Sequence, residues 1–122
     1  MEKDESALQY NMLPRSQRLS VEQFNLVMEN GRAYHSSLFL LRLTKVDGKS
    51  RVSTAVPNKV AKKATERNRL RRSMYNGVQP LMKKVKDGYF VVVFAKNTAV
   101  SASQEDINNG INEIFVKAGL LL

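Results

Sequence analysis

The first amphipathic stretch of the chain predicts a helix. Ser20 and Gln23 stand at the spacing of a capping box, in which Ser20 is the N-cap and Gln23 occupies the third helical position. Phe24, Val27 and Met28 then fall on one face of the helix and form an apolar stripe. We therefore expect a short helix that packs this stripe against the rest of the fold.

Two Asn-Gly pairs predict where helices end. The pair at 30–31 follows the first stripe, and the pair at 76–77 follows a second helix that begins between residues 58 and 64. Glycine readily adopts the left-handed conformation found just after many helices. We therefore expect a left-handed cap at Gly31 and the end of the second helix at 76–77.

Apolar runs between and after these helices predict strands. Residues 38–44 and 51–56 flank the Asp-Gly turn signal at 47–48, so we interpret them as an antiparallel hairpin. A short strand near Tyr34 is expected to precede it. Residues 89–95 are apolar without interruption, which indicates a central strand covered on both faces.

The last part of the chain predicts a further helix, with Ser103 as its cap and Asp106 at the third position. Its apolar residues recur at helical spacing and are Ile107, Ile111, Ile114, Phe115 and Ala118. The order of elements predicts an α+β fold with helices packed on one small sheet. The length of 122 residues suits a single domain, which we assign to 14–122, after a flexible tail at 1–13.

Composition narrows the possible functions. The net charge of +9 predicts an anionic partner, either a nucleic acid or a membrane surface. No apolar run approaches the roughly 20 residues of a spanning helix, and the chain does not open on an apolar signal region. We therefore expect a cytoplasmic protein without a membrane partner. The chain has no cysteine and one histidine, His35, which excludes disulfides, thiolate zinc sites and a cysteine nucleophile.

The strongest chemical signal is the basic segment at 59–72. Seven Lys or Arg residues and one acid give it a charge of +6, most of the total of +9. Only a phosphate backbone offers a matching density of negative charge. We place these residues on a helix at about 100° per residue. One broad face then holds the apolar residues Val60, Ala64, Met74 and Tyr75, and Arg67 and Arg71 fall in the middle of that face. The opposite face holds Lys62, Glu66 and Arg69.

Two interpretations of Arg67 and Arg71 stay open at this point. Their aliphatic stems could cover the sheet while their charged ends reach water. Alternatively, they present guanidinium groups, which match phosphate oxygens in pairs, along the wall of a groove between helix and sheet. Asn68 lies between the two faces and could contact a base or sugar edge, or a neighbouring loop.

Three blocks in the right order resemble the protein subunit of bacterial ribonuclease P. They are Arg18-Leu19 followed by Phe24, Val27, Met28 and Gly31; Ala64-Thr65-Glu66-Arg67-Asn68-Arg69-Leu70-Arg71-Arg72; and Gly88-Tyr89-Phe90-Val91-Val92-Val93-Phe94-Ala95-Lys96. The resemblance runs roughly from Leu13 to the C-terminus. It implies helix-strand-strand-strand-helix-strand-helix on a four-stranded sheet, with a left-handed βαβ crossover (ribosomal protein S5 domain 2-like) against the usual right-handed preference.

The resemblance also implies a function. In the family a catalytic RNA uses magnesium to remove the 5′ leader of precursor tRNA, and the protein assists without catalytic residues of its own. The implied partners are ribonuclease P RNA and precursor tRNA, with no DNA. Matching positions imply RNA-subunit contacts at Lys62, Lys63, Arg67, Asn68, Arg69, Arg71 and Arg72, and a 5′-leader groove at Phe24, Met28, Arg42 and Lys59. Phe24 either stacks on an unpaired base or packs on the sheet.

Several groove positions depart from the family pattern. Met28 replaces a second aromatic residue, so stacking there would become an adaptable apolar contact. Arg42 stands where some members carry a tyrosine, and it could stack or bind phosphate. Pro57-Asn58 replaces Ser/Ala-Lys, and Ser53 replaces a glycine that lets the leader approach the sheet.

Two other functions remain as alternatives: a structural RNA binder such as a ribosomal protein of similar fold, and a duplex DNA reader. A DNA reader of the helix-turn-helix kind needs a supporting helix and a short turn before its recognition helix, whereas strands are predicted on both sides of this basic helix. No spaced pair of acids for two magnesium ions stands out beside a strand end, nor does a Ser-His-Asp or Cys-His arrangement. These patterns favour an RNA-binding subunit over a nuclease.

Overall fold

The structure, a computed structural model, describes residues 13–122. The predicted tail therefore lies outside the described residues except for its last member, Leu13, which is fully buried in the core. Four strands form one mixed sheet in the order β1-β2-β4-β3. Their bounds are β1 (Arg32–His35), β2 (Phe39–Lys45), β3 (Arg51–Ala55) and β4 (Tyr89–Ala95).

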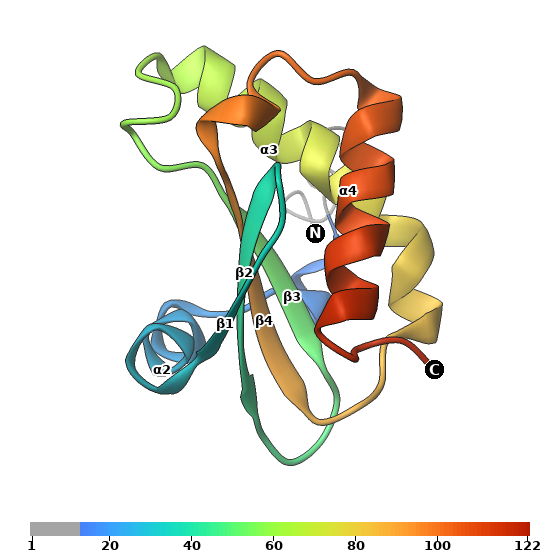
Figure 1. Ribbon diagram of the computed structural model, residues 1–122. Coiled ribbons are helices and arrows are strands. Elements are labelled where there is room, and N and C mark those ends of the chain that lie inside the picture. Colours follow the sequence, from blue (N-terminus) through green and yellow to red (C-terminus); the bar gives the residue numbers. More distant parts are fainter. Residues whose placement is uncertain (1–12) are drawn as a thin grey trace.

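Helices cover both faces of this sheet (Figure 1). One face carries α2 (Val21–Asn30), and the other carries α3 (Ala64–Val78) and α4 (Gln104–Lys117). The short helical turns are η1 (Arg15–Gln17), η2 (Gln79–Lys84) and η3 (Asn97–Ala99). This is the predicted α+β fold, with β4 in the interior of the sheet as its apolar run indicated.

The predicted hairpin of residues 38–44 and 51–56 is wrong. β2 pairs antiparallel with β1 and β4, and β3 pairs parallel with the far edge of β4. The Asp-Gly signal does make a turn, since Gly48 has φ +97°, but a local turn does not specify which strand is the neighbour. A strand that is apolar on both faces is typical of the interior of a sheet, and β4 lies there, between β2 and β3.

The start of α2 confirms the predicted capping box. The Gln23 backbone N–H donates to Ser20 Oγ at 3.2 Å, and the Ser20 backbone N–H donates to Gln23 Oε1 at 2.9 Å. The predicted left-handed cap at Gly31 is wrong, because Gly31 has an extended backbone with φ −74°. A Cβ at this position would lie 2.3 Å from the Val27 carbonyl oxygen, so glycine is needed there for close approach.

The second helix does not end at 76–77 as predicted. Gly77 lies inside α3 and is buried against α4, where an added Cβ would lie 3.2 Å from Ile111 Cγ1. Glycine at this position allows the two helices to pack closely. The chain stays helical through Val78 and tightens into η2, which carries Pro80 near its start, where a missing N–H is tolerated.

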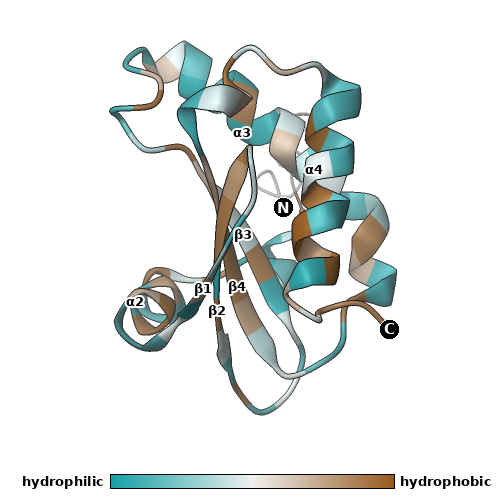
Figure 2. Cartoon of the chain, in the orientation of Figure 1, coloured by the Kyte–Doolittle hydropathy of each residue, from teal (hydrophilic) through white to brown (hydrophobic). Residues whose placement is uncertain are grey.

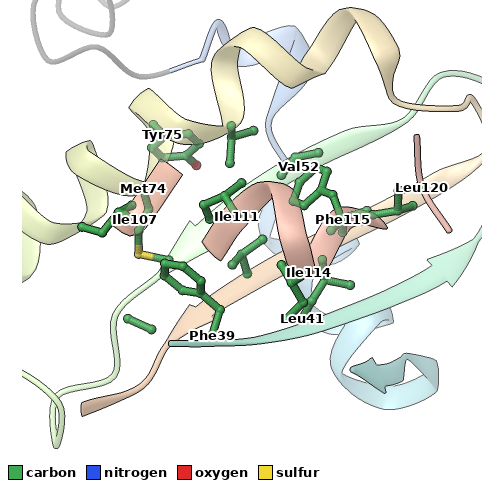
Figure 3. Packing of buried hydrophobic residues seen from close by; sticks show 14 of the residues in the cluster. Phe39, Leu41, Val52, Met74, Tyr75, Ile107, Ile111, Ile114, Phe115 and Leu120 are labelled. Atoms are coloured by element: carbon green, nitrogen blue, oxygen red, sulfur yellow. The ribbon is translucent and has the colours of Figure 1, made fainter. Parts of the chain in front are cut away.

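The core lies between the sheet and the pair α3 and α4. Figure 3 shows Met74 and Tyr75 of α3 and Ile111 of α4 close to Phe39 and Val52 of the sheet. The predicted cap of α4 is confirmed, and four of its five predicted apolar residues are buried: Ile107, Ile111, Ile114 and Phe115, with Ala118 partly so. In Figure 2 the central strands are largely hydrophobic, and α4 alternates along its length as an amphipathic helix should.

Candidate nucleic-acid interface

The sheet face that α2 covers carries a second set of inward-pointing side chains. Side chains alternate between the faces of a strand, so Leu40 and Arg42 of β2 lie opposite Phe94 and Val92 of β4 on this face. α2 packs across β2 and β4, with Val27 fully buried. The helix leaves part of this face uncovered beside it, near Leu40 of β2 and at the end of β4 that carries Phe94 and Ala95.

A groove of about 590 Å³ opens at that place. Three of the four predicted leader-groove residues line it, namely Met28, Arg42 and Lys59. Most of its surface is apolar, and Leu40 and Phe94 are among the apolar residues that line it. Two lysines, Lys59 and Lys96, also line it. The residues that line the groove are Met28, Ser37, Leu40, Arg42, Pro57, Lys59, Val60, Phe94, Ala95, Lys96, Asn97 and Thr98.

Phe24, the fourth predicted residue, does not line the groove. Its half-buried ring packs edge-on against Phe94, with the ring centroids 6.1 Å apart and the planes at 66°. Phe94 is the aromatic residue exposed in the groove, and sequence reasoning missed it. The uninterrupted apolar run of β4 gave no sign of which face would be open, although its alternation placed Phe94 with Val92.

Arg42 holds α2 in place. Its Nη2 donates to the Met28 carbonyl at 3.1 Å and to the Gly31 carbonyl at 3.3 Å. The last carbonyls of a helix have no partner within the helix, and a cation is favourable at that end. Arg42 therefore supplies the cap that the extended Gly31 cannot, and its Nε is buried without a hydrogen-bond partner in the described part of the chain.

The departures from the family pattern have structural consequences. Ser53 Oγ accepts a hydrogen bond from the Leu19 backbone N–H at 2.9 Å, which ties the segment before α2 to β3. Pro57 lines the groove, and its carbonyl accepts from the Val60 N–H at 2.9 Å in a turn. Asn58 is exposed and does not line the groove.

The buried face of α3 differs from the predicted one. It consists of Leu70, Met74, Tyr75, Gly77 and Val78. Ala64, assigned to the apolar face, is exposed, and Val60 precedes the helix. Met74 and Tyr75 were predicted on the apolar face and are buried, whereas Leu70, Gly77 and Val78 were not counted on it. Arg67 and Arg71 lie half-buried.

Among residues 13–122, Arg67 and Arg71 donate to amide and carbonyl oxygens and not to carboxylates. Arg67 Nη1 donates to the Ala61 carbonyl at 3.1 Å and to the Lys62 carbonyl at 2.7 Å, so it fixes the segment leading into α3. Arg71 Nη2 donates to Asn68 Oδ1 at 2.7 Å. Within the described residues, the Asn68 amide oxygen therefore accepts from its own helix and not from a neighbouring loop, and its contact with a base or sugar edge stays a prediction.

The other predicted RNA-subunit residues form an open cationic surface around the start of α3. Lys62, Lys63 and Arg69 are exposed, as is Asn68, while Arg72 is half-buried. The segment at 57–63 joins this surface to the groove, since Pro57, Lys59 and Val60 line the groove and Arg67 anchors residues 61 and 62. The basic helix and the groove are therefore contiguous.

An α+β fold with a basic helix beside a partly aromatic groove is typical of nucleic-acid-binding proteins. The model of the family described as Ribonuclease P matches residues 13–119. The chain belongs to the ribonuclease P protein family, whose members are protein components of the RNA enzyme that processes the 5′ end of tRNA. This membership favours the ribonuclease P interpretation over a ribosomal protein or a duplex DNA reader.

Relatives and solved structures agree with this assignment. The ribonuclease P protein component of Synechocystis sp. is 30% identical over 112 residues, covering 89% of this chain and 90% of the relative. That of Symbiobacterium thermophilum is 30% identical over 100 residues, covering 80% and 86%. The Staphylococcus aureus RNase P protein superposes with a TM-score of 0.77 at 16% identity, covering 87% and 98%. The Thermotoga maritima protein gives 0.69 at 21%, covering 80% and 94%, so these two structures share the fold.

Proposed function

We propose that this chain binds ribonuclease P RNA through the exposed cations at the start of α3 and holds the single-stranded 5′ leader of precursor tRNA in the groove. The observation that carries the proposal is the contiguity of the two surfaces through the segment at 57–63. A polyanion docked on α3 is thereby brought beside a groove of a size suited to unpaired nucleotides.

The chemistry of the groove supports an unpaired nucleotide as its occupant. Phe94 offers an aromatic ring beside Leu40, and a base stacked on such a ring contributes about 1–3 kcal/mol. Lys59 lines the same groove and is exposed, so its ammonium group can meet a backbone phosphate. Lys96 donates to the Ser36 carbonyl at 2.7 Å and adds positive charge at the strand end.

The proposal assigns the cleavage chemistry to the RNA subunit. Among residues 13–122, no three His, Asp or Glu side chains lie close enough together to hold a metal ion. In this proposal the magnesium that the family resemblance implies is held by the RNA. None of the described helices is long and apolar enough to cross a membrane.

Reconstitution with a bacterial ribonuclease P RNA tests this function. Precursor tRNA with a leader of several nucleotides is cleaved at low magnesium with and without the purified protein. We expect the protein to raise the cleavage rate, because cations that neutralise RNA phosphates replace part of the magnesium requirement. A rate no higher than that of the RNA alone, under conditions where a known ribonuclease P protein does raise it, would overturn the proposal.

A further inference from the structure

A second hollow, of about 640 Å³, lies at the other end of β4 from the groove. It is formed by η1, the turn between β2 and β3, and the segment that connects η2 to β4. None of the residues predicted to contact RNA lines it. It is therefore a feature that the proposed function does not use.

The side chains of this hollow are strongly cationic. Lys49, Arg51, Lys83 and Lys86 line it together with one acid, Asp87, so four positive charges minus one leave +3. Arg51 donates through Nη1 to a carbonyl, that of Arg18, at 3.2 Å. In the described part of the chain, no hydrogen bond or ion pair engages the ammonium groups of the three lysines. Lys49 comes from the turn between β2 and β3, and Lys83 and Lys86 come from the stretch at the end of η2, so two segments distant in sequence line one space.

The backbone that carries these lysines is held from two sides. Ser50 Oγ donates to the Lys86 carbonyl and accepts from the Tyr89 N–H, the latter at 2.9 Å. The Lys86 N–H donates to the Leu120 carbonyl at 2.8 Å, and the Leu122 N–H donates to the Lys84 carbonyl at 2.7 Å. These hydrogen bonds hold the backbone segments that carry the lysines close to one another. The positive charges of the lysines repel one another at this distance, and a bound anion would relieve that repulsion.

The hollow is too far from the groove to share one phosphate with it. β4 separates them, and at roughly 3.3 Å per residue it spans about 20 Å. η2, by contrast, continues directly from α3, so the basic helix and the hollow follow one another along the chain (Figure 1). A large folded RNA docked on α3 is the partner with phosphates available at both places.

We propose that this hollow is a second phosphate-binding site for ribonuclease P RNA, an inference that rests on the proposed function. The phosphates of that RNA backbone meet Lys49, Lys83 and Lys86, and Arg51 contributes from the wall. The contact is electrostatic and independent of base sequence. It extends the RNA-binding surface from α3 past η2 to the far end of the sheet.

A pair of double variants with equal charge change tests this site. The hollow variant is Lys83→Gln with Lys86→Gln, and the control is Lys45→Gln with Lys84→Gln, two exposed lysines that do not line the hollow. Affinity for ribonuclease P RNA is measured across a range of salt concentrations, and thermal unfolding verifies that both variants fold. We expect the hollow variant to flatten the salt dependence by about two units, one for each lysine, and the control to flatten it far less.

Two results would overturn the inference. One is a hollow variant that matches the control in affinity and in salt slope. The other is a loss confined to precursor tRNA, measured in a parallel titration, which would assign the site to the substrate. Both results require a wild-type protein that binds ribonuclease P RNA. Absence of wild-type binding would instead mean failure of the proposed function, so the two failures are distinguishable.

Discussion

At the scale of single residues, Arg42 decides how α2 is held beside the groove. Its guanidinium caps two carbonyls at the end of the helix, those of Met28 and Gly31. The sequence leaves stacking and phosphate binding open for this position. The hydrogen bonds instead make it a positioning residue, which sets the place of Met28 in the groove wall.

Replacing Arg42 tests this role. Arg42→Met keeps an unbranched stem but removes the donors, and we expect a loss of about 1.5–3 kcal/mol in the free energy of unfolding, the range for hydrogen bonds to charged groups. Urea denaturation measures it. Arg32→Met, on the exposed face of β1, is the matched control and should change stability little. Equal losses in the two variants would mean that the cap contributes nothing.

The two groove-side phenylalanines are expected to differ. Phe94 lines the groove, whereas Phe24 packs against it from the edge. Phe94→Leu should therefore weaken binding of leader-bearing substrate by about 1–3 kcal/mol, with a smaller loss for Phe24→Leu. Fluorescence titration with precursor and mature tRNA, in the presence of the RNA subunit, measures both. A loss that is the same for mature tRNA would point to a fold defect and not to a stacking contact.

For single residues, the sequence predicted correctly those contacts that form between close neighbours in the chain. The capping box of Ser20 and Gln23 depends on residues three apart, and it formed as expected. Gly31 was assigned for its conformational freedom, whereas its real constraint is contact with Val27, which only the packed structure contains. Phe94 was missed for a related reason, because burial on each face of β4 depends on where α2 crosses the strand.

At the scale of elements, α3 combines two tasks on adjacent faces. Its buried face centres on Leu70 and Met74, its exposed cations face solvent, and Arg67 lies at the boundary with its guanidinium on the preceding segment. The sequence left two interpretations of Arg67 open: a charged end that reaches water, and a guanidinium presented to phosphate. Neither interpretation includes the hydrogen bonds that Arg67 makes to the backbone of residues 61 and 62. Arg67 organises the segment that carries Lys62.

Arg67 and Arg69 should consequently respond differently to truncation. Arg69 is exposed, so Arg69→Ala should weaken binding of ribonuclease P RNA and flatten its salt dependence by about one unit without changing stability. Arg67→Ala should do this and also lower the free energy of unfolding by about 1–3 kcal/mol, because two backbone acceptors lose their donor. Isothermal binding measurements and urea denaturation separate the effects. An unchanged salt slope for Arg69→Ala would exclude its contact with RNA.

Strand and helix positions were predictable from the sequence, but strand pairing was not. Residues 38–44 and 51–56 are strands, yet the turn between them joins segments that β4 separates in the sheet. Pairing depends on which strand is apolar on both faces and so lies inside the sheet, and on the crossover through α3. A local turn signal contains neither kind of information. Gly77 illustrates the same limit, since packing against α4 kept it helical.

At the scale of the whole molecule, the sheet separates the hydrophobic core from the groove. One face holds the core under α3 and α4, and the other face holds α2 and the groove (Figure 1). The charge of the basic segment was evident from the sequence, and so was the class of partner. The groove is lined by residues of α2 and β4, which are distant in sequence. Only the folded chain therefore shows that the basic segment meets the groove through residues 57–63.

We propose that the cations around α3 recognise one particular folded RNA, and the rest of the proposed function depends on this recognition. The most direct test is an equilibrium titration of the wild-type protein with ribonuclease P RNA and with a random-sequence RNA of equal length, at the same physiological salt concentration. We expect clearly tighter binding to ribonuclease P RNA, and a loss of that preference in the double variant Lys62→Ala with Arg69→Ala. Equal affinity of the wild-type protein for the two RNAs would contradict the proposal.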